Sequence, residues 1–150
     1  MIQSYKNPKQ ITRLVETLHR ASSNALILVS HSIGSCQLEE VLLQLPNVYV
    51  LYVQGSRGDF VTVQNYLNAI DWLLSNGFEF DWLINLSAQD YPIRSLKQIE
   101  RALQKTQYDG FLECFKVFSE ESPWGIAEGK TRYYYRYRKI DRNLPEWQKT

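Results

Sequence analysis

The sequence predicts an α/β fold in which helices flank a mainly parallel β-sheet. Short apolar runs, the right length for buried strands, alternate along the chain with segments of helical periodicity. That alternation is typical of strand–helix–strand units, which build parallel sheets. The chain has 150 residues, of which 44% are hydrophobic and 22% are charged, so we expect a single domain spanning 1–150 with a substantial core.

The first half of the chain supplies two predicted helices and two predicted strands. A helix should begin just after Pro8, because apolar residues then recur at helical spacing at Ile11, Leu14, Val15 and Leu18. The run 25–29 is predicted to be a buried strand, and 37–45 a helix that stops before Pro46. Residues 48–53 are rich in β-branched and aromatic side chains and should form a second strand.

The second half continues the alternation. A further helix is indicated by apolar residues at helical spacing, Val63, Leu67, Ile70 and Leu74. It should end at 76-NG-77, because glycine commonly terminates helices. Residues 82–86 read as a third strand, with Pro92 ending the extended segment. Ser95 and Gln98 form a capping-box pattern for a following helix. Residues 108–115 are predicted to be a fourth strand, 119–130 to be irregular, and 131–140 to be a further strand.

Ligands of parallel sheets bind at the carboxyl ends of the strands, and three loops are expected to meet there. These loops are 31–36, 54–60 and 87–94, and each is polar or contains glycine, as a nucleotide site requires. The sequence contains neither GxGxxG after the first strand nor GxxxxGK[ST], so the ordinary dinucleotide and P-loop sites are excluded.

Composition excludes several other classes of function. The net charge of the whole chain is only +1, so we expect no nucleic-acid partner, although residues 130–142 hold six basic residues and one acid. Cys36 and Cys114 have no metal-binding spacing and are predicted to be two free thiols rather than a disulfide. No segment approaches the roughly 18 apolar residues of a membrane helix, and no signal pattern opens the chain. A cytoplasmic or membrane-peripheral location is therefore expected.

The run 85-NLSAQDYPIRS-95 closely resembles the core-2/I-branching glycosyltransferase family, whose hallmark is Asp-Tyr/Phe-Pro-Ile/Leu followed by a basic residue and a helix. That family contains β-1,6-N-acetylglucosaminyltransferases and peptide O-xylosyltransferases. Similar segments are 58-GDF-60, 111-FLE-113 and 132-RYYYRYRK-139. The resemblance is strong over 58–115 and weaker, but collinear, from Asn7 onward.

The resemblance implies a GT-A-like fold and an inverting, metal-independent transfer of GlcNAc or xylose from UDP-GlcNAc or UDP-xylose to a glycan or other hydroxyl acceptor. It implies no cofactor: a carboxylate base would deprotonate the acceptor, and basic residues would stabilise the departing diphosphate. Family members run well past 150 residues, so this chain should be the N-terminal, nucleotide-sugar-binding half of such an enzyme, inactive alone, with its catalytic residues unassigned. The family's usual Asp after the first strand is replaced here by Ser32.

By resemblance, the donor-binding residues would be His31, Ser32, Gly58, Asp59, Gln89 and Asp90. Simpler interpretations remain open. His31 can be a buried structural histidine. Gly58 and Asp59 can form a tight turn and a helix N-cap. Asp90 can brace the turn before Pro92, and as the only acid of its loop it is not predicted to bind a metal.

The acceptor-binding candidates are Glu113, Lys130 and Arg132. Glu113 interrupts an apolar strand, and a carboxylate buried there would need either a ligand or an ion pair with the late arginines. Lys130 and Arg132 can instead belong to a solvated face.

Two other functions are compatible with an α/β fold. A non-catalytic binding domain with the same half-fold is one alternative; a phosphoacceptor domain using Asp90 is disfavoured, because the first strand lacks the necessary acids. The tripeptide 57-RGD-59 should only open a helix. Asn85, in the sequon 85-NLS-87, should be buried in a strand.

Overall fold

The computed structural model of the chain describes residues 1–22, 24–55 and 60–135. The chain divides into two compact units, Met1–Thr106 and Gln107–Thr150. The described residues of the first unit form the β-sheet and four helices, and those of the second unit form one helix.

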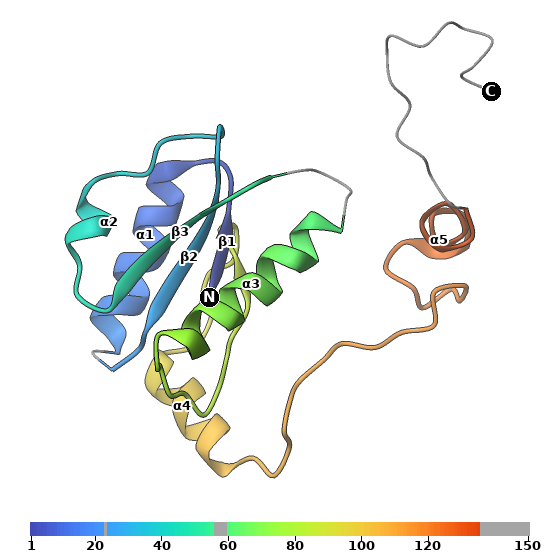
Figure 1. Ribbon diagram of the computed structural model, residues 1–150. Coiled ribbons are helices and arrows are strands. Elements are labelled where there is room, and N and C mark those ends of the chain that lie inside the picture. Colours follow the sequence, from blue (N-terminus) through green and yellow to red (C-terminus); the bar gives the residue numbers. More distant parts are fainter. Residues whose placement is uncertain (23, 56–59, 136–150) are drawn as a thin grey trace, which may run out of the picture. The chain divides into compact units, whose positions relative to one another are not determined.

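The sheet of the first unit has four strands, β1 (Ile2–Ser4), β2 (Ile27–Ser32), β3 (Val48–Val53) and β4 (Leu86–Ser87), in the order β3-β2-β1-β4 (Figure 1). All three neighbouring pairs are parallel. The predicted α/β class with a parallel sheet is therefore confirmed.

Helices lie on both faces of this sheet. Helix α1 (Pro8–Ala21) and the short α2 (Val41–Gln44) cover one face, and α3 (Val61–Ser75) covers the other (Figure 1). Helix α4 (Leu96–Lys105) contacts α1. Pro8 occupies the first turn of α1, where its missing N–H has no partner to lose, so the predicted start of this helix is confirmed.

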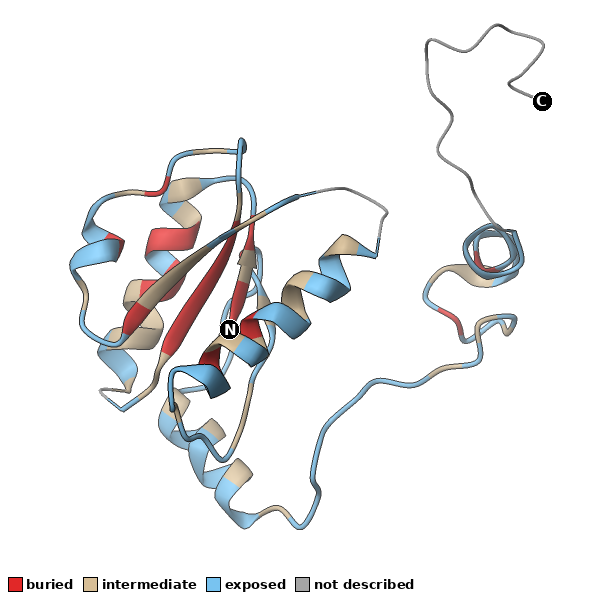
Figure 2. Ribbon diagram, in the orientation of Figure 1, coloured by how far each residue is buried: buried red, intermediate tan, exposed pale blue. Residues whose placement is uncertain are grey.

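Two separate apolar cores result, and Figure 2 shows the buried residues concentrated on the central strands and the helix faces that meet them. The core under α1 and α2 includes Ile2, Ile11, Leu14, Val15, Val29 and Leu42. The core under α3 contains Leu28, Ala69 and Leu73, with Tyr49, Trp72 and Phe78 packed around them. Because alternate residues of β2 face different cores, the first three residues of this strand, Ile27, Leu28 and Val29, are all apolar and buried, as expected of a strand covered on both faces.

Three predicted elements of the first unit have different bounds. The strand expected at 25–29 lies at Ile27–Ser32, because His31 and Ser32 pair with Tyr52 and Val53 of β3 and so lengthen the strand at its carboxyl end. The helix expected at 37–45 is shorter and spans only Val41–Gln44. The strand predicted at 48–53, in contrast, has the expected bounds, Val48–Val53.

The strand expected at 82–86 is present only as Leu86–Ser87, which pair with Ile2 and Gln3. In that register Asn85 lies beside Met1, which precedes β1 and whose N-terminal ammonium donates to the Ile84 carbonyl at 2.8 Å. Residues 82–84 extend past the first residue of the chain and have no strand residue to pair with. Asn85 consequently lies outside the strand and is exposed, so the prediction that it is buried in the core was wrong.

The second unit departs most from the predictions. Residues 108–115 are irregular, and Phe111 and Leu112 are 63% and 95% exposed, so the prediction of a buried strand there was wrong. Among residues 107–135 there is no strand to supply backbone partners, and an unpaired strand is not stable. Helix α5 (Gly125–Tyr133) occupies part of the stretches expected to be irregular or a strand, while 136–140 lie outside the described residues.

Candidate functional site

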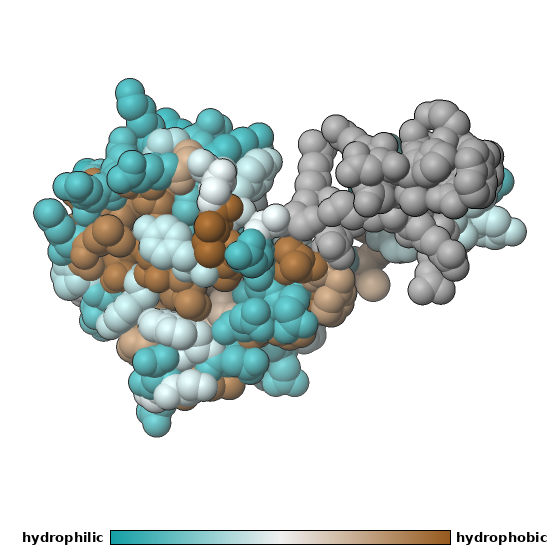
Figure 3. All heavy atoms as spheres, turned by 45° about the horizontal axis from the view of Figure 1, so that its top comes forward, coloured by the Kyte–Doolittle hydropathy of each residue, from teal (hydrophilic) through white to brown (hydrophobic). Residues whose placement is uncertain are grey.

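The carboxyl ends of the four parallel strands lie at one edge of the sheet, called here the carboxyl edge. β1 ends at Ser4, β2 at Ser32, β3 at Val53 and β4 at Ser87, so three of the four strands end in a serine. Figure 3 turns this edge toward the viewer and shows hydrophilic and hydrophobic residues side by side on it. Such an edge can bind a ligand that has both polar groups and a planar ring.

The loop after β2 begins with a tight turn. The Ser35 N–H donates to the Ser32 carbonyl at 3.4 Å, and Gly34 has φ +77°, a conformation in which glycine is favoured over other residues. The Ile33 N–H donates to the Val53 carbonyl at 2.8 Å, which carries the β2–β3 ladder one residue beyond the strand. The turn is thus anchored to the neighbouring strand and projects from the carboxyl edge.

Gly55 packs directly against Ser32 from the loop after β3. A Cβ atom at Gly55 would lie 1.8 Å from Ser32 Oγ, so only glycine fits beside Ser32 without a rearrangement. From the sequence, Gly55 is only one residue of the predicted loop 54–60. The close approach depends on which strands are neighbours, and the sequence pattern alone does not give that order.

His31 lies beneath the turn rather than on it. Its side chain is 1% exposed and makes an edge-on contact with Tyr52, with ring centroids 6.1 Å apart. Nδ1 is 2.8 Å from Ser4 Oγ, and Nε2 is 2.6 Å from the Cys36 carbonyl oxygen and 3.2 Å from Ser35 Oγ. Both ring nitrogens are therefore bonded within the protein, as expected of a structural histidine, and the imidazole is not open to a ligand.

The loop after β4 contains Gln89 and Asp90, which are both exposed. Asp90 Oδ2 accepts the Ser87 N–H at 2.6 Å, and the Asp90 N–H donates to the Ser87 carbonyl at 3.1 Å. The Gln89 N–H donates to Ser87 Oγ at 3.3 Å. Asp90 therefore braces the turn, as one interpretation predicted, and its exposed carboxylate remains at the carboxyl edge.

Gly58 and Asp59 lie outside the described residues. The Phe60 carbonyl accepts the first described bonds of α3, from Val63 and Gln64, each at 2.9 Å. The interpretation of Gly58 and Asp59 as a turn and an N-cap therefore falls outside the described residues. At α4 the predicted capping box is present: Ser95 and Gln98 exchange side-chain-to-backbone bonds of 3.3 Å in both directions.

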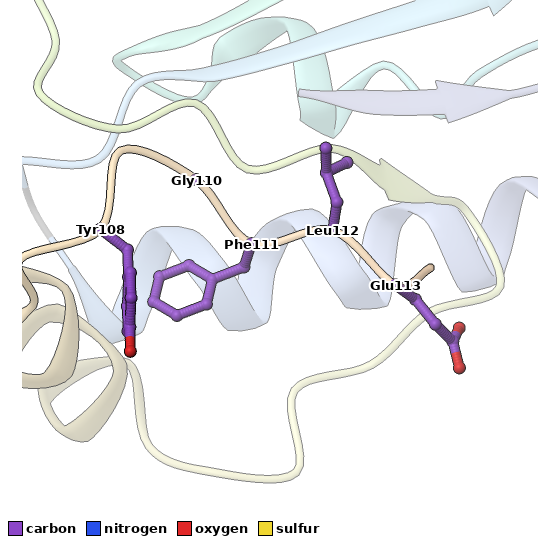
Figure 4. A pocket seen from close by; sticks show the side chains of 5 residues that line it. All are labelled: Tyr108, Gly110, Phe111, Leu112 and Glu113. Atoms are coloured by element: carbon purple, nitrogen blue, oxygen red, sulfur yellow. The ribbon is translucent and has the colours of Figure 1, made fainter. Parts of the chain in front are cut away.

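In the second unit, Glu113 lines an open hollow of about 390 Å³ together with Tyr108, Gly110, Phe111 and Leu112. Figure 4 shows the Phe111 ring turned toward Tyr108, with the Glu113 carboxylate pointing away from this aromatic pair. The two rings meet edge to face, with centroids 6.1 Å apart. Glu113 is exposed, so the predicted cost of burying its carboxylate does not arise.

Lys130 and Arg132 both lie on α5 and are exposed. Arg132 is already engaged, since its Nε and Nη2 donate to Glu128 Oε1 at 2.9 and 2.7 Å and its guanidinium lies 4.9 Å from the centre of the Trp124 ring. This i,i+4 pair and the contact with Trp124 are typical of a helix surface. Lys130 has no such contact among the described residues and is the less constrained of the two cations.

Among residues 1–22, 24–55 and 60–135, no group of three or more His, Cys, Asp or Glu side chains is placed to hold a metal ion, and no helix is long and apolar enough to cross a membrane. Cys36 and Cys114 are free thiols.

Comparison with known proteins gives one finding about the family. The family model described as Core-2/I-Branching enzyme matches residues 2–150. No curated protein and no solved structure matches significantly. The family match covers almost the whole chain, so the resemblance based on 85-NLSAQDYPIRS-95 is confirmed. The parallel sheet flanked by helices agrees with the GT-A-like fold expected of that family.

Proposed function

We propose that this chain, which belongs to the Core-2/I-branching enzyme family of glycosyltransferases, binds a UDP-sugar and takes part in transferring GlcNAc or xylose to an acceptor hydroxyl. The observation that carries the proposal is the family match over residues 2–150. The polar carboxyl edge of the parallel sheet supports it, because nucleotides bind at this edge in α/β folds.

The donor would lie at the carboxyl edge of the first unit. Ser32 and the exposed Gln89 and Asp90 offer hydroxyl, amide and carboxylate groups to a uridine ring or ribose. Gly58 and Asp59 remain donor-binding candidates by resemblance to the family. His31 would act from below, since its side chain is buried.

The acceptor would be bound by residues of the second unit. Glu113 can accept hydrogen bonds from sugar hydroxyls, and the neighbouring Tyr108 and Phe111 supply apolar ring surface for the carbon face of a sugar. Lys130 and Arg132 would bind negatively charged groups. The acceptor class supported best is a glycan with a free hydroxyl.

The proposed reaction is a direct displacement with inversion. The acceptor oxygen forms a bond to C1 of the donor sugar as the bond from C1 to the UDP oxygen breaks, and a carboxylate takes the acceptor's proton. Positive side chains rather than a metal ion would stabilise the diphosphate leaving group. The carboxylate that serves as base is unassigned.

The proposal can be tested by calorimetric titration of the full chain with UDP, UDP-GlcNAc and UDP-xylose, with ADP as the control nucleotide. We expect UDP and one UDP-sugar to bind more tightly than ADP, with the same affinity in EDTA as in millimolar Mg²⁺. Equal, negligible binding of UDP and ADP would contradict a UDP-sugar site. Saturable UDP binding together with sugar transfer to a glycan acceptor would exclude a non-catalytic binding domain, whereas binding without transfer is expected of both, because this half is predicted to be inactive alone.

A further inference from the structure

A chain of hydrogen bonds runs beneath the carboxyl edge through one buried imidazole. It begins at Ser4 at the end of β1, passes through both nitrogens of His31 on β2, and ends at the Cys36 carbonyl in the following loop. The bond lengths are 2.8 Å to Ser4 Oγ and 2.6 Å to the Cys36 oxygen. His31 therefore connects two neighbouring strand ends with the far side of the 33–36 loop.

The geometry assigns the protons in this chain. A backbone carbonyl has no hydrogen to donate, so His31 Nε2 must carry a hydrogen and donate it to the Cys36 oxygen. In the neutral ring Nδ1 then accepts, and the Ser4 hydroxyl donates to it. The Nε2–H bond to the loop is present whichever way the Ser4 hydroxyl turns.

The 33–36 loop needs such support because its side chains add little burial. Ile33 is 53% exposed, and Gly34 and Ser35 are exposed as well. Loops with few buried apolar contacts open at a low cost in free energy. The hydrogen bond from the fully buried His31 ring to the Cys36 carbonyl ties this loop to strand β2, whose position is fixed by the sheet.

We propose that His31 is a positioning residue: it holds the 33–36 loop in the conformation that receives the donor nucleotide, without contacting that nucleotide. This inference rests on the proposed UDP-sugar site at the carboxyl edge. A loop that is already ordered does not have to be ordered when the ligand binds, so the bond from His31 to the loop should increase the affinity for UDP. Losing the equivalent of one net hydrogen bond should weaken UDP binding about three- to tenfold.

Two substitutions separate the two bonds of the ring. In His31→Gln the side-chain amide reaches the position of Nε2 and can donate to the Cys36 carbonyl, whereas in His31→Asn the shorter amide reaches only the position of Nδ1 and Ser4. We expect His31→Asn to weaken UDP binding and His31→Gln to stay within about twofold of the wild type. Equal affinities for the two variants would overturn the proposal.

Amide hydrogen exchange of residues 33–36 gives a readout that does not depend on UDP. We expect faster exchange there in His31→Asn, and wild-type exchange in His31→Gln and in Ser4→Ala, which keeps the bond to Cys36. His19→Asn is the matched control, because it changes the chain's other histidine, at the opposite end of α1 from the carboxyl edge. Unchanged loop exchange in His31→Asn would show that the ring does not hold the loop.

The unmodified protein offers a measurement that no folding defect can obscure. Long-range ¹H–¹⁵N spectra of its imidazoles should show His31 with a hydrogen on Nε2, and an Nδ1–H tautomer would overturn the assignment. A wild-type chain that fails to bind UDP refutes the proposed donor site. The tautomer and the loop exchange still decide whether His31 positions the loop.

Discussion

Replacing Gly55 with alanine should destabilise the first unit through a collision between the loops after β2 and β3. The new Cβ would lie 1.8 Å from Ser32 Oγ and 2.9 Å from Ser32 Cβ. The first overlap can be relieved by rotating the serine hydroxyl to another rotamer. The second cannot, because Cβ is fixed to the backbone of β2, so one of the two loops has to shift.

The expected cost follows from that remaining overlap. Inserting one methyl group into a packed site costs about 1–3 kcal/mol when the neighbouring backbone must move. The φ angle of Gly55 lies outside the positive range, so backbone strain adds nothing to this figure. We expect Gly55→Ala to lower the free energy of unfolding by about 2 kcal/mol, which for a chain of this size lowers Tm by about 4–8 °C.

Urea unfolding followed by circular dichroism measures this effect. The matched control is Gly110→Ala, which has no atom within 4 Å of the new Cβ and no positive φ, and should change stability by no more than about 0.5 kcal/mol. Replacing Ser32 with glycine as well removes both colliding atoms and should recover most of the loss. A Gly55→Ala protein as stable as the wild type, or one that the second substitution fails to rescue, would refute the reasoning.

Three further changes test other parts of the fold. Leu14→Ala removes a fully buried side chain from the core under α1 and should cost about 2–5 kcal/mol in urea unfolding, while Leu112→Ala, at a position 95% exposed, should cost no more than about 0.5 kcal/mol. Ser95→Ala removes the N-cap of α4 and should cost about 1 kcal/mol, with a loss of helical circular dichroism; an unchanged spectrum and stability would contradict the capping box. Asp90→Ala removes the acceptor of the Ser87 N–H and should cost about 0.5–1.5 kcal/mol, whereas Asp90→Asn retains a side-chain oxygen and should cost less; equal losses would mean that this bond does not brace the turn.

Sequence predictions were accurate where the structure depends on residues close together in the chain, and less accurate where it depends on distant ones. The start of α1 at Pro8 and the capping box of Ser95 and Gln98 depend on residues a few positions apart, and both were confirmed. Strand predictions failed where a segment lacked a neighbouring strand to pair with. Residues 82–85 and 108–115 are apolar enough for strands, but within the described residues they have no neighbouring strand in register, and β1 was missed because three residues carry too little pattern.

The sequence by itself determined the α/β class and the family, because strand and helix periodicity and the run 85-NLSAQDYPIRS-95 are local signals. It also identified the loops after β2, β3 and β4 as the candidate site, since parallel strands end at one edge. Only the tertiary structure decided what the residues there do. It placed His31 under the turn, bonded to Ser4 and Cys36, and pressed Gly55 against Ser32. These contacts depend on the strand order β3-β2-β1-β4, which brings distant segments together and which no local pattern contains.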